Sequence, residues 1–170
     1  FGLIAYWWHA ALAYANHVQA ISTYLGKLAK DFGYTGAISI VPNGVDTTKF
    51  SIFPPNADLP LADNFQIIIT VSRLVEKNGV DTLIRAFAQV HKKYPSTELH
   101  IVGDGPLRFQ LEALAHELGI DKRVKFFGLA PYEKIPEYLR TADVFVRSSR
   151  SEGLGTAFLE AMAAGVPIIA

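Results

Sequence analysis

From about residue 65 onward, short apolar runs alternate with longer segments in which apolar residues recur every three or four positions. A short run rich in β-branched residues is typical of a buried strand, whereas the longer spacing predicts a helix with one apolar face. The runs that predict strands are 66–71, 98–102, 123–127, 143–146 and 167–170. The segments that predict helices lie between them, at about 79–93, 107–118, 133–141 and 156–164.

Strands that alternate with helices of this length favour βαβ units, in which parallel strands form one sheet covered on both faces. The sequence therefore predicts an α/β fold with a Rossmann-like parallel sheet over residues 65–170. In open parallel sheets, ligands bind in the crevice outside the carboxyl ends of the strands. We therefore look for functional residues in the loops that follow the strands.

The chain before residue 65 has a different character. Two short apolar runs, 17–22 and 37–41, flank a helical segment and predict a small αβ unit over residues 1–44, interpreted as the remainder of another domain. Residues 45–64 include SIFPPNADLP, and such a stretch rich in proline and asparagine is typical of a linker. The expected organisation is thus 1–44, a linker at 45–64, and a domain at 65–170.

The opening run FGLIAYWWHAALAYA is apolar and aromatic. A membrane-spanning helix needs about 20 such residues, and this run ends sooner, at Asn16 and His17. We expect a helix that packs against another part of a longer protein, with a membrane-associated segment as the alternative. The chain starts at Phe1 and stops at Ala170 inside an apolar run, so we interpret both ends as cuts.

Composition narrows the classes of function. Lys plus Arg and Asp plus Glu both number 16, so the net charge is zero, which argues against a nucleic-acid-binding surface. The absence of cysteine excludes disulfides and thiolate metal sites. It is compatible with a cytoplasmic protein. The five histidines show no spacing that suggests a metal site.

Two loops carry polar groups suited to an anion. Arg73 and Lys77 follow the first strand of the predicted sheet. The loop before the last predicted helix contains Gly153 and Gly155, and the helix begins near Thr156. A helix N-terminus preceded by glycines offers free backbone N–H groups and a positive dipole end, which together favour a phosphate.

Two glutamates lie beside this helix start. Glu152 precedes the helix and Glu160 lies about one turn inside it, so both can face the same cleft. A carboxylate accepts hydrogen bonds from the neighbouring hydroxyls of a ribose or a hexose. The cations suit a diphosphate, and the two carboxylates suit a ribose and a hexose. Together they predict a nucleotide-sugar site.

Five motifs, in order, resemble the retaining glycosyltransferases with the GT-B fold, a group that includes sucrose synthases and bacterial mannosyltransferases. They are VPNGVD (41–46), VSRLVEKNGVDTLIRAF (71–87), LHIVGDGP (99–106), VKFFG (124–128) and SEGLGTAFLEAMAAGVPIIA (151–170). The last is the most specific, because its two glutamates, its glycines and its Glu-Ala-Met-Ala-x-Gly-x-Pro stretch all have the family spacing. The resemblance implies a GT-B donor domain, incomplete at its end, after a remnant of the acceptor domain.

The resemblance also implies residue roles. Arg73 and Lys77 would neutralise the donor diphosphate, and Glu152 would hydrogen-bond the transferred sugar. Glu160 would hold the ribose. The backbone N–H groups that would contact sugar and phosphate are those of Gly153, Leu154, Gly155 and Thr156. Fixed cations and a helix end can stabilise a departing nucleotide, so we expect neither a metal nor a cofactor.

Two positions depart from the family pattern. The family usually has lysine directly before the glycine, whereas here Asn78 precedes Gly79 and Lys77 lies one residue earlier. We expect Lys77 to reach the phosphates through a small shift of the loop. Arg147 stands where the family often has proline, and we interpret it as a solvated charge, with an extra contact as the alternative.

Two further segments are less specific. The glycines of GDGP (103–106) are interpreted as serving a tight turn between strand and helix, with the lining of the nucleotide pocket as the alternative. Pro131 and Tyr132 are considered as neighbours of the base. Neither segment would indicate a nucleotide site by itself.

The predicted reaction of the parent protein is transfer of a hexose from a nucleoside diphosphate sugar to a hydroxyl, with retention and without a metal. The expected partners are the donor and the rest of the acceptor domain, with no nucleic acid. Because most of that domain is missing, we expect no turnover by this chain alone. The expected location is cytoplasmic, with the cytoplasmic membrane face as a further option.

Several alternatives stay open. A GT-B phosphorylase would carry pyridoxal phosphate, and no lysine here lies in an evident motif for that cofactor; a sugar-nucleotide epimerase is a related option. The others are a non-catalytic nucleotide-binding module and an oxidoreductase. An oxidoreductase would need Gly-x-Gly-x-x-Gly at its first helix, where this chain has Ser72-Arg73-Leu74.

Overall fold

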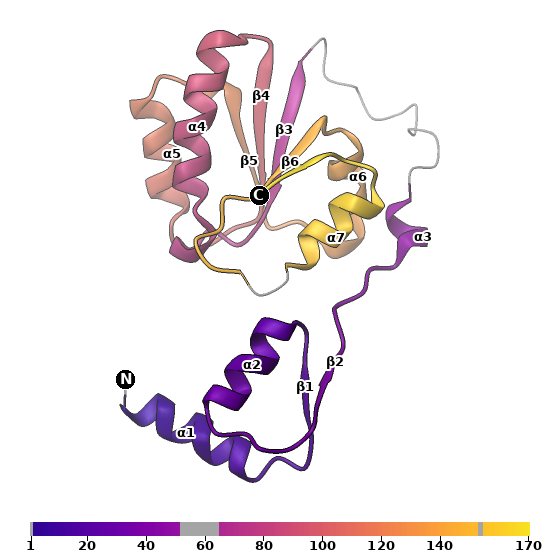
Figure 1. The fold of residues 1–170 in the computed structure, drawn as a ribbon. Coiled ribbons are helices and arrows are strands. Elements are labelled where there is room, and N and C mark those ends of the chain that lie inside the picture. Colours follow the sequence, from indigo (N-terminus) through magenta and orange to yellow (C-terminus); the bar gives the residue numbers. More distant parts are fainter. Residues whose placement is uncertain (1, 52–64, 153–154) are drawn as a thin grey trace. The chain divides into compact units, whose positions relative to one another are not determined.

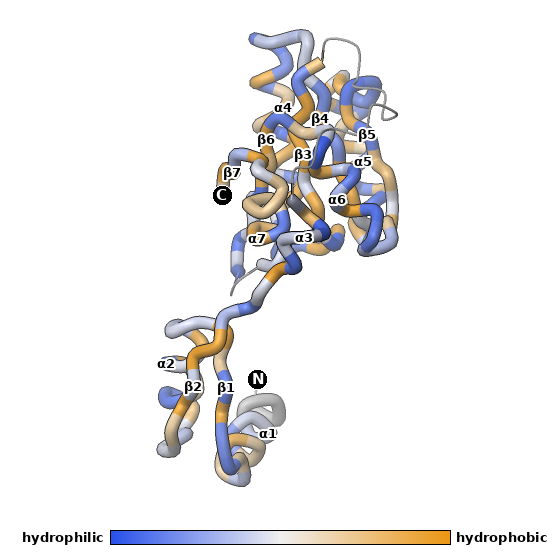
Figure 2. Tube along the Cα trace, turned by 90° about the vertical axis from the view of Figure 1, so that its right-hand side faces the viewer, coloured by the Kyte–Doolittle hydropathy of each residue, from blue (hydrophilic) through white to orange (hydrophobic). Residues whose placement is uncertain are grey.

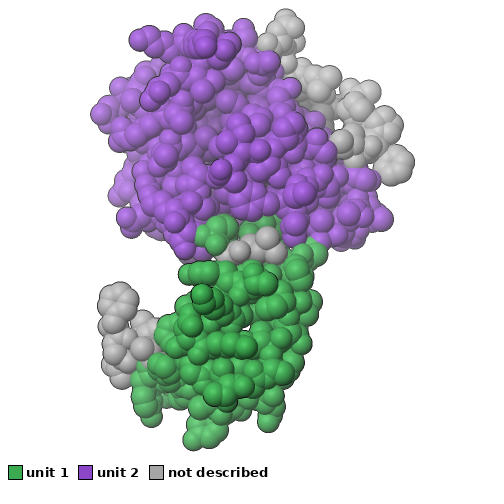
Figure 3. Space-filling model, in the orientation of Figure 1, with its two compact units in different colours: residues 1–44, 152–156 green, residues 45–151, 157–170 purple. Residues whose placement is uncertain are grey.

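A computed structural model describes residues 2–51, 65–152 and 155–170 (Figure 1). Contacts between residues divide the chain into two compact units, Phe1–Gly44 with Glu152–Thr156, and Val45–Ser151 with Ala157–Ala170 (Figure 3). Most of the predicted linker, residues 52–64, lies outside the described residues. Each unit is described below by itself.

The second unit contains a five-stranded sheet with the order β5-β4-β3-β6-β7. All of its strand pairs are parallel. This confirms the predicted α/β fold with a parallel sheet. The strands are β3 (Gln66–Val71), β4 (Thr97–Val102), β5 (Val124–Gly128), β6 (Val144–Val146) and β7 (Ile168–Ile169).

Helices cover both faces of this sheet (Figure 1). On one face lie α4 (Val80–Lys93) and α5 (Arg108–Glu117), and on the other α6 (Ile135–Arg140) and α7 (Thr156–Ala163). The unit also contains α3 (Thr47–Phe50) and the 3₁₀ turns η1 (Glu76–Asn78), η2 (Asp121–Arg123) and η3 (Tyr132–Lys134). The predicted helices are confirmed to within a few residues at their ends.

Alternate residues of each strand supply two hydrophobic cores. Leu99 and Ile101 of β4 pack with Phe87 of α4, whereas Ile69 of β3 packs with Phe145 of β6 on the other face. Figure 2 shows the hydrophobic colouring along these strands. Full burial of one such side chain contributes about 1.5–3 kcal/mol. The sheet is therefore held rigidly between its two helical layers.

The strand order creates a switch point beside β3. The chain runs outward from β3 to β4 and β5, and then returns to place β6 on the opposite side of β3. The loops after β3 and β6 therefore leave adjacent strands at the same edge of the sheet. Ligand sites of open α/β sheets lie at this kind of position.

The first unit is one βαβ unit preceded by a helix. Its elements are α1 (Gly2–Ala13), β1 (Val18–Ala20), α2 (Thr23–Asp31) and β2 (Ile38–Ile40), and the two strands pair in parallel. The hydroxyl of Ser22 caps α2 by accepting a hydrogen bond from the backbone N–H of Leu25 at 3.2 Å. This confirms the predicted αβ character of the segment.

The aromatic side chains of α1 point into solvent in this chain. Tyr6, Trp7 and Trp8 are all exposed, whereas Leu12 is buried. No helix in the described part of the chain has the length and apolar character needed to cross a membrane.

Candidate functional site

The loop after β3, residues 72–79, carries both predicted cations and is called the basic loop below. Arg73 and Lys77 are exposed, and the loop closes through η1 and Gly79, from which α4 begins. Gly79 has a φ of 61°, and a Cβ atom there would come within 2.0 Å of the carbonyl oxygen of Ser148. Only glycine fits this approach without movement of the backbone. The loop after β3 thus lies directly against the loop after β6.

Asn78 links these two loops through its side chain. It is 4% exposed, and its Nδ2 donates to the carbonyl oxygen of Arg73 at 2.6 Å. Its Oδ1 accepts from Nη2 of Arg147 at 3.5 Å. The family lysine would supply a charge at this position. Asn78 instead connects the backbone of the basic loop to Arg147, which follows the neighbouring strand β6.

Arg147 is not the solvated charge that the sequence suggested. It is half-buried at the end of β6, and its Nη1 donates to the carbonyl oxygen of Val71 at 2.8 Å. Its Nε donates to Oγ of Ser149 at 2.9 Å. The partners Val71 and Asn78 lie 76 and 69 residues away in the sequence, so only the pairing of β3 with β6 brings them together.

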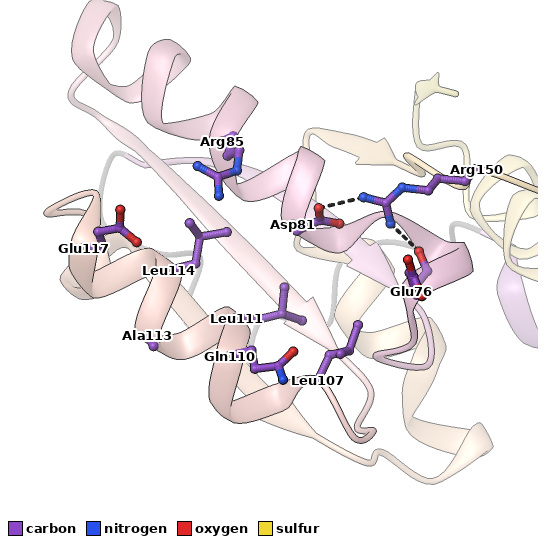
Figure 4. A pocket seen from close by; sticks show the side chains of 10 residues that line it. All are labelled: Glu76, Asp81, Arg85, Leu107, Gln110, Leu111, Ala113, Leu114, Glu117 and Arg150. Carbon is purple, nitrogen blue, oxygen red and sulfur yellow. Dashed lines mark hydrogen bonds and ion pairs between the residues drawn. The ribbon is translucent and has the colours of Figure 1, made fainter.

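Further bonds join the same two loops. The backbone N–H of Arg150 donates to the carbonyl oxygen of Lys77 at 2.8 Å. Its guanidinium pairs with Asp81 at 2.6 Å and donates to the carbonyl oxygen of Glu76 (Figure 4). The backbone of the basic loop is therefore held at several points, while the side chains of Arg73 and Lys77 reach solvent.

A cavity of about 460 Å³ opens at the carboxyl ends of β3 and β4, beside the segment that follows β5. Arg73 is part of its lining, so a cation stands at its edge. Ser72 is buried there, and its Oγ has no hydrogen-bond partner among the described residues. The lining residues are Val71, Ser72, Arg73, Val102, Gly103, Asp104, Leu129, Ala130 and Ile135.

The glycines of the GDGP segment allow the loop after β4 to contact the loop after β3. A Cβ atom at Gly103 would come within 2.0 Å of the carbonyl oxygen of Ser72, and one at Gly105 within 2.5 Å of that of Leu74. These two loops can therefore approach closely only because neither glycine has a side chain. Gly103 also lines the cavity, so this segment contributes to the cavity wall as well as to the contact between the loops.

Asp104 also lines this cavity and adds a negative charge to it. It accepts hydrogen bonds from the backbone N–H of Gly105 at 2.7 Å and from Arg108 at 3.1 Å. These bonds lower the pKa of the Asp104 carboxyl below its usual value, so it is ionised at neutral pH. A carboxylate accepts hydrogen bonds from hydroxyl or amino groups, whereas the cation Arg73 suits a phosphate.

Glu160 is buried inside the second unit. It is 6% exposed on α7, and its carboxylate lies beside the hydroxyl of Tyr132. Burial raises the pKa of this carboxyl, and the interaction with Tyr132 opposes part of the rise. Within the described part of the chain, neither Glu160 nor Tyr132 belongs to the lining of the 460 Å³ cavity.

The remaining predicted residues fall elsewhere. Gly153 and Leu154 lie outside the described residues. Glu152 and Thr156 are exposed, Gly155 is half-buried, and all three are grouped with the first unit. The structure therefore brings Arg73 and Lys77 together in one loop, and defines no arrangement between that loop and Glu152.

A second hollow of about 650 Å³ lies between α4 and α5 (Figure 4). Its lining includes the cations Arg85 and Arg150 and the acids Glu76, Asp81 and Glu117. Two cations against three acids leave a negative balance, which disfavours a diphosphate. The sequence did not predict this hollow, because it depends on how the two helices pack.

Solved structures with this fold are GT-B glycosyltransferases, and that is the class to which the sheet and its switch-point loops correspond. Sucrose-phosphate synthase from Thermosynechococcus elongatus superposes with a TM-score of 0.80 at 29% identity, over 94% of this chain and 41% of that one. Anabaena HepE, solved with UDP and glucose, gives a TM-score of 0.79 at 27% identity, over 93% of this chain and 45% of the other.

The chain belongs to the family Glycosyl transferases group 1, which it matches over residues 55–170. A GDP-mannose-dependent α-(1-6)-phosphatidylinositol monomannoside mannosyltransferase of Mycolicibacterium smegmatis is 36% identical over 169 residues, which cover 92% of this chain and 44% of the relative. An α-monoglucosyldiacylglycerol synthase of Acholeplasma laidlawii is 29% identical, over 80% and 36% respectively. The chain thus spans less than half the length of these relatives. The resemblance to GT-B glycosyltransferases that the motifs carry is confirmed.

Proposed function

We propose that the second unit binds the nucleotide-sugar donor of a glycosyltransferase. The diphosphate lies against Arg73 and Lys77, and the base of the nucleotide enters the 460 Å³ cavity, with the ribose outside it. The observation that carries this proposal is that Arg73 belongs both to the basic loop and to the cavity lining, at the carboxyl ends of β3 and β4. In parallel α/β sheets that edge is the usual place for a ligand.

The chemistry of transfer explains why cations are placed there. The bond between the anomeric carbon and the phosphate oxygen breaks, and the departing nucleoside diphosphate gains negative charge. Arg73 and Lys77 stabilise that charge without a metal or a cofactor. Loss of one such preorganised donor typically lowers the rate by about 10²–10³-fold.

The other predicted roles complete this proposal. Glu152 and the backbone N–H groups of Gly153 to Thr156 bind the transferred sugar and its phosphate, and Glu160 binds the ribose. The sugar keeps its anomeric configuration. Residues 1–44 belong to the acceptor side of the enzyme and residues 65–170 to the donor side, joined by the linker at 45–64.

The relatives suggest which donors and acceptors to test first. One relative is named for GDP-mannose and one neighbour was solved with UDP and glucose. We therefore propose a hexose carried by GDP or UDP. Two relatives are named for a phosphatidylinositol monomannoside and for a diacylglycerol, so we propose the hydroxyl of a membrane lipid as the acceptor. The proposed location is the cytoplasmic face of that membrane.

Binding of nucleoside diphosphates tests the proposal without requiring turnover. Titration calorimetry of the chain with GDP, UDP and ADP is expected to detect one preferred ligand. Arg73→Ala is expected to weaken its binding about 10- to 100-fold, since a hydrogen bond to a charged group contributes about 1.5–3 kcal/mol.

Arg85→Ala is the matched control, because Arg85 is an exposed arginine on α4 that is not part of the cavity lining. It should leave the affinity unchanged. Absence of binding by all three nucleotides, or equal binding by the Arg73→Ala protein, would refute the assignment.

A further inference from the structure

The side chain of Arg147 connects the ends of two adjacent strands. Arg147 directly follows β6, and its guanidinium donates to the carbonyl oxygen of Val71, the last residue of β3, at 2.8 Å. It also donates to Ser149 in its own loop at 2.9 Å and to Asn78 at 3.5 Å. All three nitrogen atoms of the guanidinium therefore donate to protein acceptors. This is typical of an arginine that holds loops in place, here those after β3 and β6.

Asn78 connects Arg147 to the backbone of Arg73. Its buried amide accepts from Arg147 through Oδ1 and donates to the carbonyl oxygen of Arg73 through Nδ2. Arg73 itself is exposed and lines the cavity. The direction in which its side chain leaves the loop therefore depends on a backbone that Asn78 holds.

Both partners are chemically suited to this connection. The planar fork of arginine presents donors from three nitrogen atoms in fixed directions, whereas the three donors of a lysine ammonium all leave one nitrogen atom and cannot span the same acceptors. An amide is neutral and offers a donor and an acceptor at once, which a lysine at position 78 would not. The two positions at which this chain departs from the family pattern thus contact each other.

We propose that Asn78 and Arg147 form a positioning pair that orients Arg73 toward the diphosphate of the donor. This inference rests on the proposed donor site. Arg147 acts through Asn78 and does not touch the donor. Arg147 contributes to donor binding through the directions of its hydrogen bonds to the loops, which a positive charge alone does not supply.

Substitutions that separate geometry from charge test the pair. The ligands are the nucleoside diphosphate that the unmodified chain prefers, measured by calorimetry, and the matching nucleoside without phosphates, measured by NMR titration. Arg147→Lys keeps the charge and loses the fork, whereas Asn78→Ala loses the connection at constant charge. Each is expected to weaken binding of the diphosphate about 10-fold and to change binding of the nucleoside less than twofold.

The double variant Asn78→Ala/Arg147→Met is expected to bind no more weakly than Arg147→Met alone, because residues in one network do not act additively. Arg85→Met is the control for loss of an arginine outside the loop and should bind normally. Thermal unfolding of each variant verifies that it is folded. If Arg147→Met does not fold, Arg147→Lys decides the question.

Three results would overturn the pair: normal diphosphate binding by Arg147→Lys, additive losses in the double variant, or an equal loss of nucleoside binding. Failure of the donor site itself is distinguishable. In that case the unmodified chain binds none of the nucleotides, or Arg73→Ala binds as well as the unmodified chain does.

Discussion

The hydroxyl of Tyr132 lies beside the carboxylate of Glu160, which is buried on α7. Tyr132 is itself held by Phe50, whose ring centroid lies 5.8 Å from its own. One of the two signature glutamates is therefore part of the packed interior of the second unit. Its burial makes the charge of Glu160 costly to the folded state.

Glu160→Gln is expected to stabilise the chain at neutral pH. Burial raises the pKa of Glu160 above 4.5, so its contribution to stability is fully present below the unfolded pKa and is lost as the pH rises through the folded pKa. Glutamine keeps an acceptor for Tyr132 and removes the charge. The free energy of unfolding should rise by about 0.5–2 kcal/mol at pH 7.

Urea unfolding at pH 7 and pH 4 measures this difference, which should shrink at the lower pH. Glu117→Gln, on the exposed face of α5, is the control and should stay within about 0.5 kcal/mol at both values. A destabilised Glu160→Gln protein at pH 7 would contradict the prediction. If Glu160 also holds the ribose, the same variant binds donor more weakly.

Glu98→Gln is expected to have the opposite effect. Glu98 is 4% exposed on β4 and contacts Lys125 at 2.7 Å and His100 at 3.3 Å. Burial tends to raise the pKa of Glu98, but the hydrogen bonds from Lys125 and His100 outweigh it, and the pKa is lowered from 4.5. Its contribution is therefore present above pH 4.5 and is lost as the pH falls through the folded pKa.

Loss of these charge-assisted bonds should lower the free energy of unfolding by about 1.5–3 kcal/mol at pH 7. The difference from the unmodified chain should decrease steadily as the pH falls below 4.5. Glu137→Gln, which removes an exposed ion pair with Lys134, should cost less than about 1 kcal/mol. A pH-independent loss for Glu98→Gln would show that shape, not charge, matters at this position.

Gly79→Ala is expected to destabilise the chain more than Gly119→Ala. Both glycines have positive φ, at 61° and 69°, so both substitutions incur the backbone cost of about 1–2 kcal/mol. A Cβ atom at Gly119 meets nothing within 4 Å, whereas one at Gly79 comes within 2.0 Å of the carbonyl oxygen of Ser148. The difference between the two variants isolates the contact between the loops.

Urea unfolding should place Gly79→Ala at least about 1 kcal/mol below Gly119→Ala, the scale of overpacking in a closely packed site. Donor binding should fall only in Gly79→Ala, since Gly119 is at the end of α5 and away from the basic loop. Equal stability of the two variants would mean that the loops separate without cost.

Most elements of the fold could be predicted from local patterns. The β-branched run of β3 and the apolar spacing of α4 are properties of neighbouring residues, and each predicts its element directly. The basic loop with Arg73 and Lys77 was found for the same reason, since it follows a recognisable strand. The family resemblance, carried by motifs such as 151–170, also needed no coordinates.

The partners of Arg147 and Glu160 could not be predicted in this way. The sequence alone favoured a solvated charge for Arg147 and considered Tyr132 as a neighbour of the base. In the structure Arg147 donates to Val71 and Asn78, and the hydroxyl of Tyr132 lies beside the carboxylate of Glu160. No local pattern indicates such pairs, because each joins segments that are distant along the chain.

The sequence by itself thus determined the elements, the α/β class, the family and the cations that stand at the strand ends. Only the tertiary structure decided which loops touch, that Asn78 and Arg147 are joined, and that Glu160 is buried. The physical reason is that strand and helix formation depend on neighbouring residues, whereas contacts between loops depend on the order of strands in the sheet. That order places β6 beside β3, and it arises only when the whole unit packs.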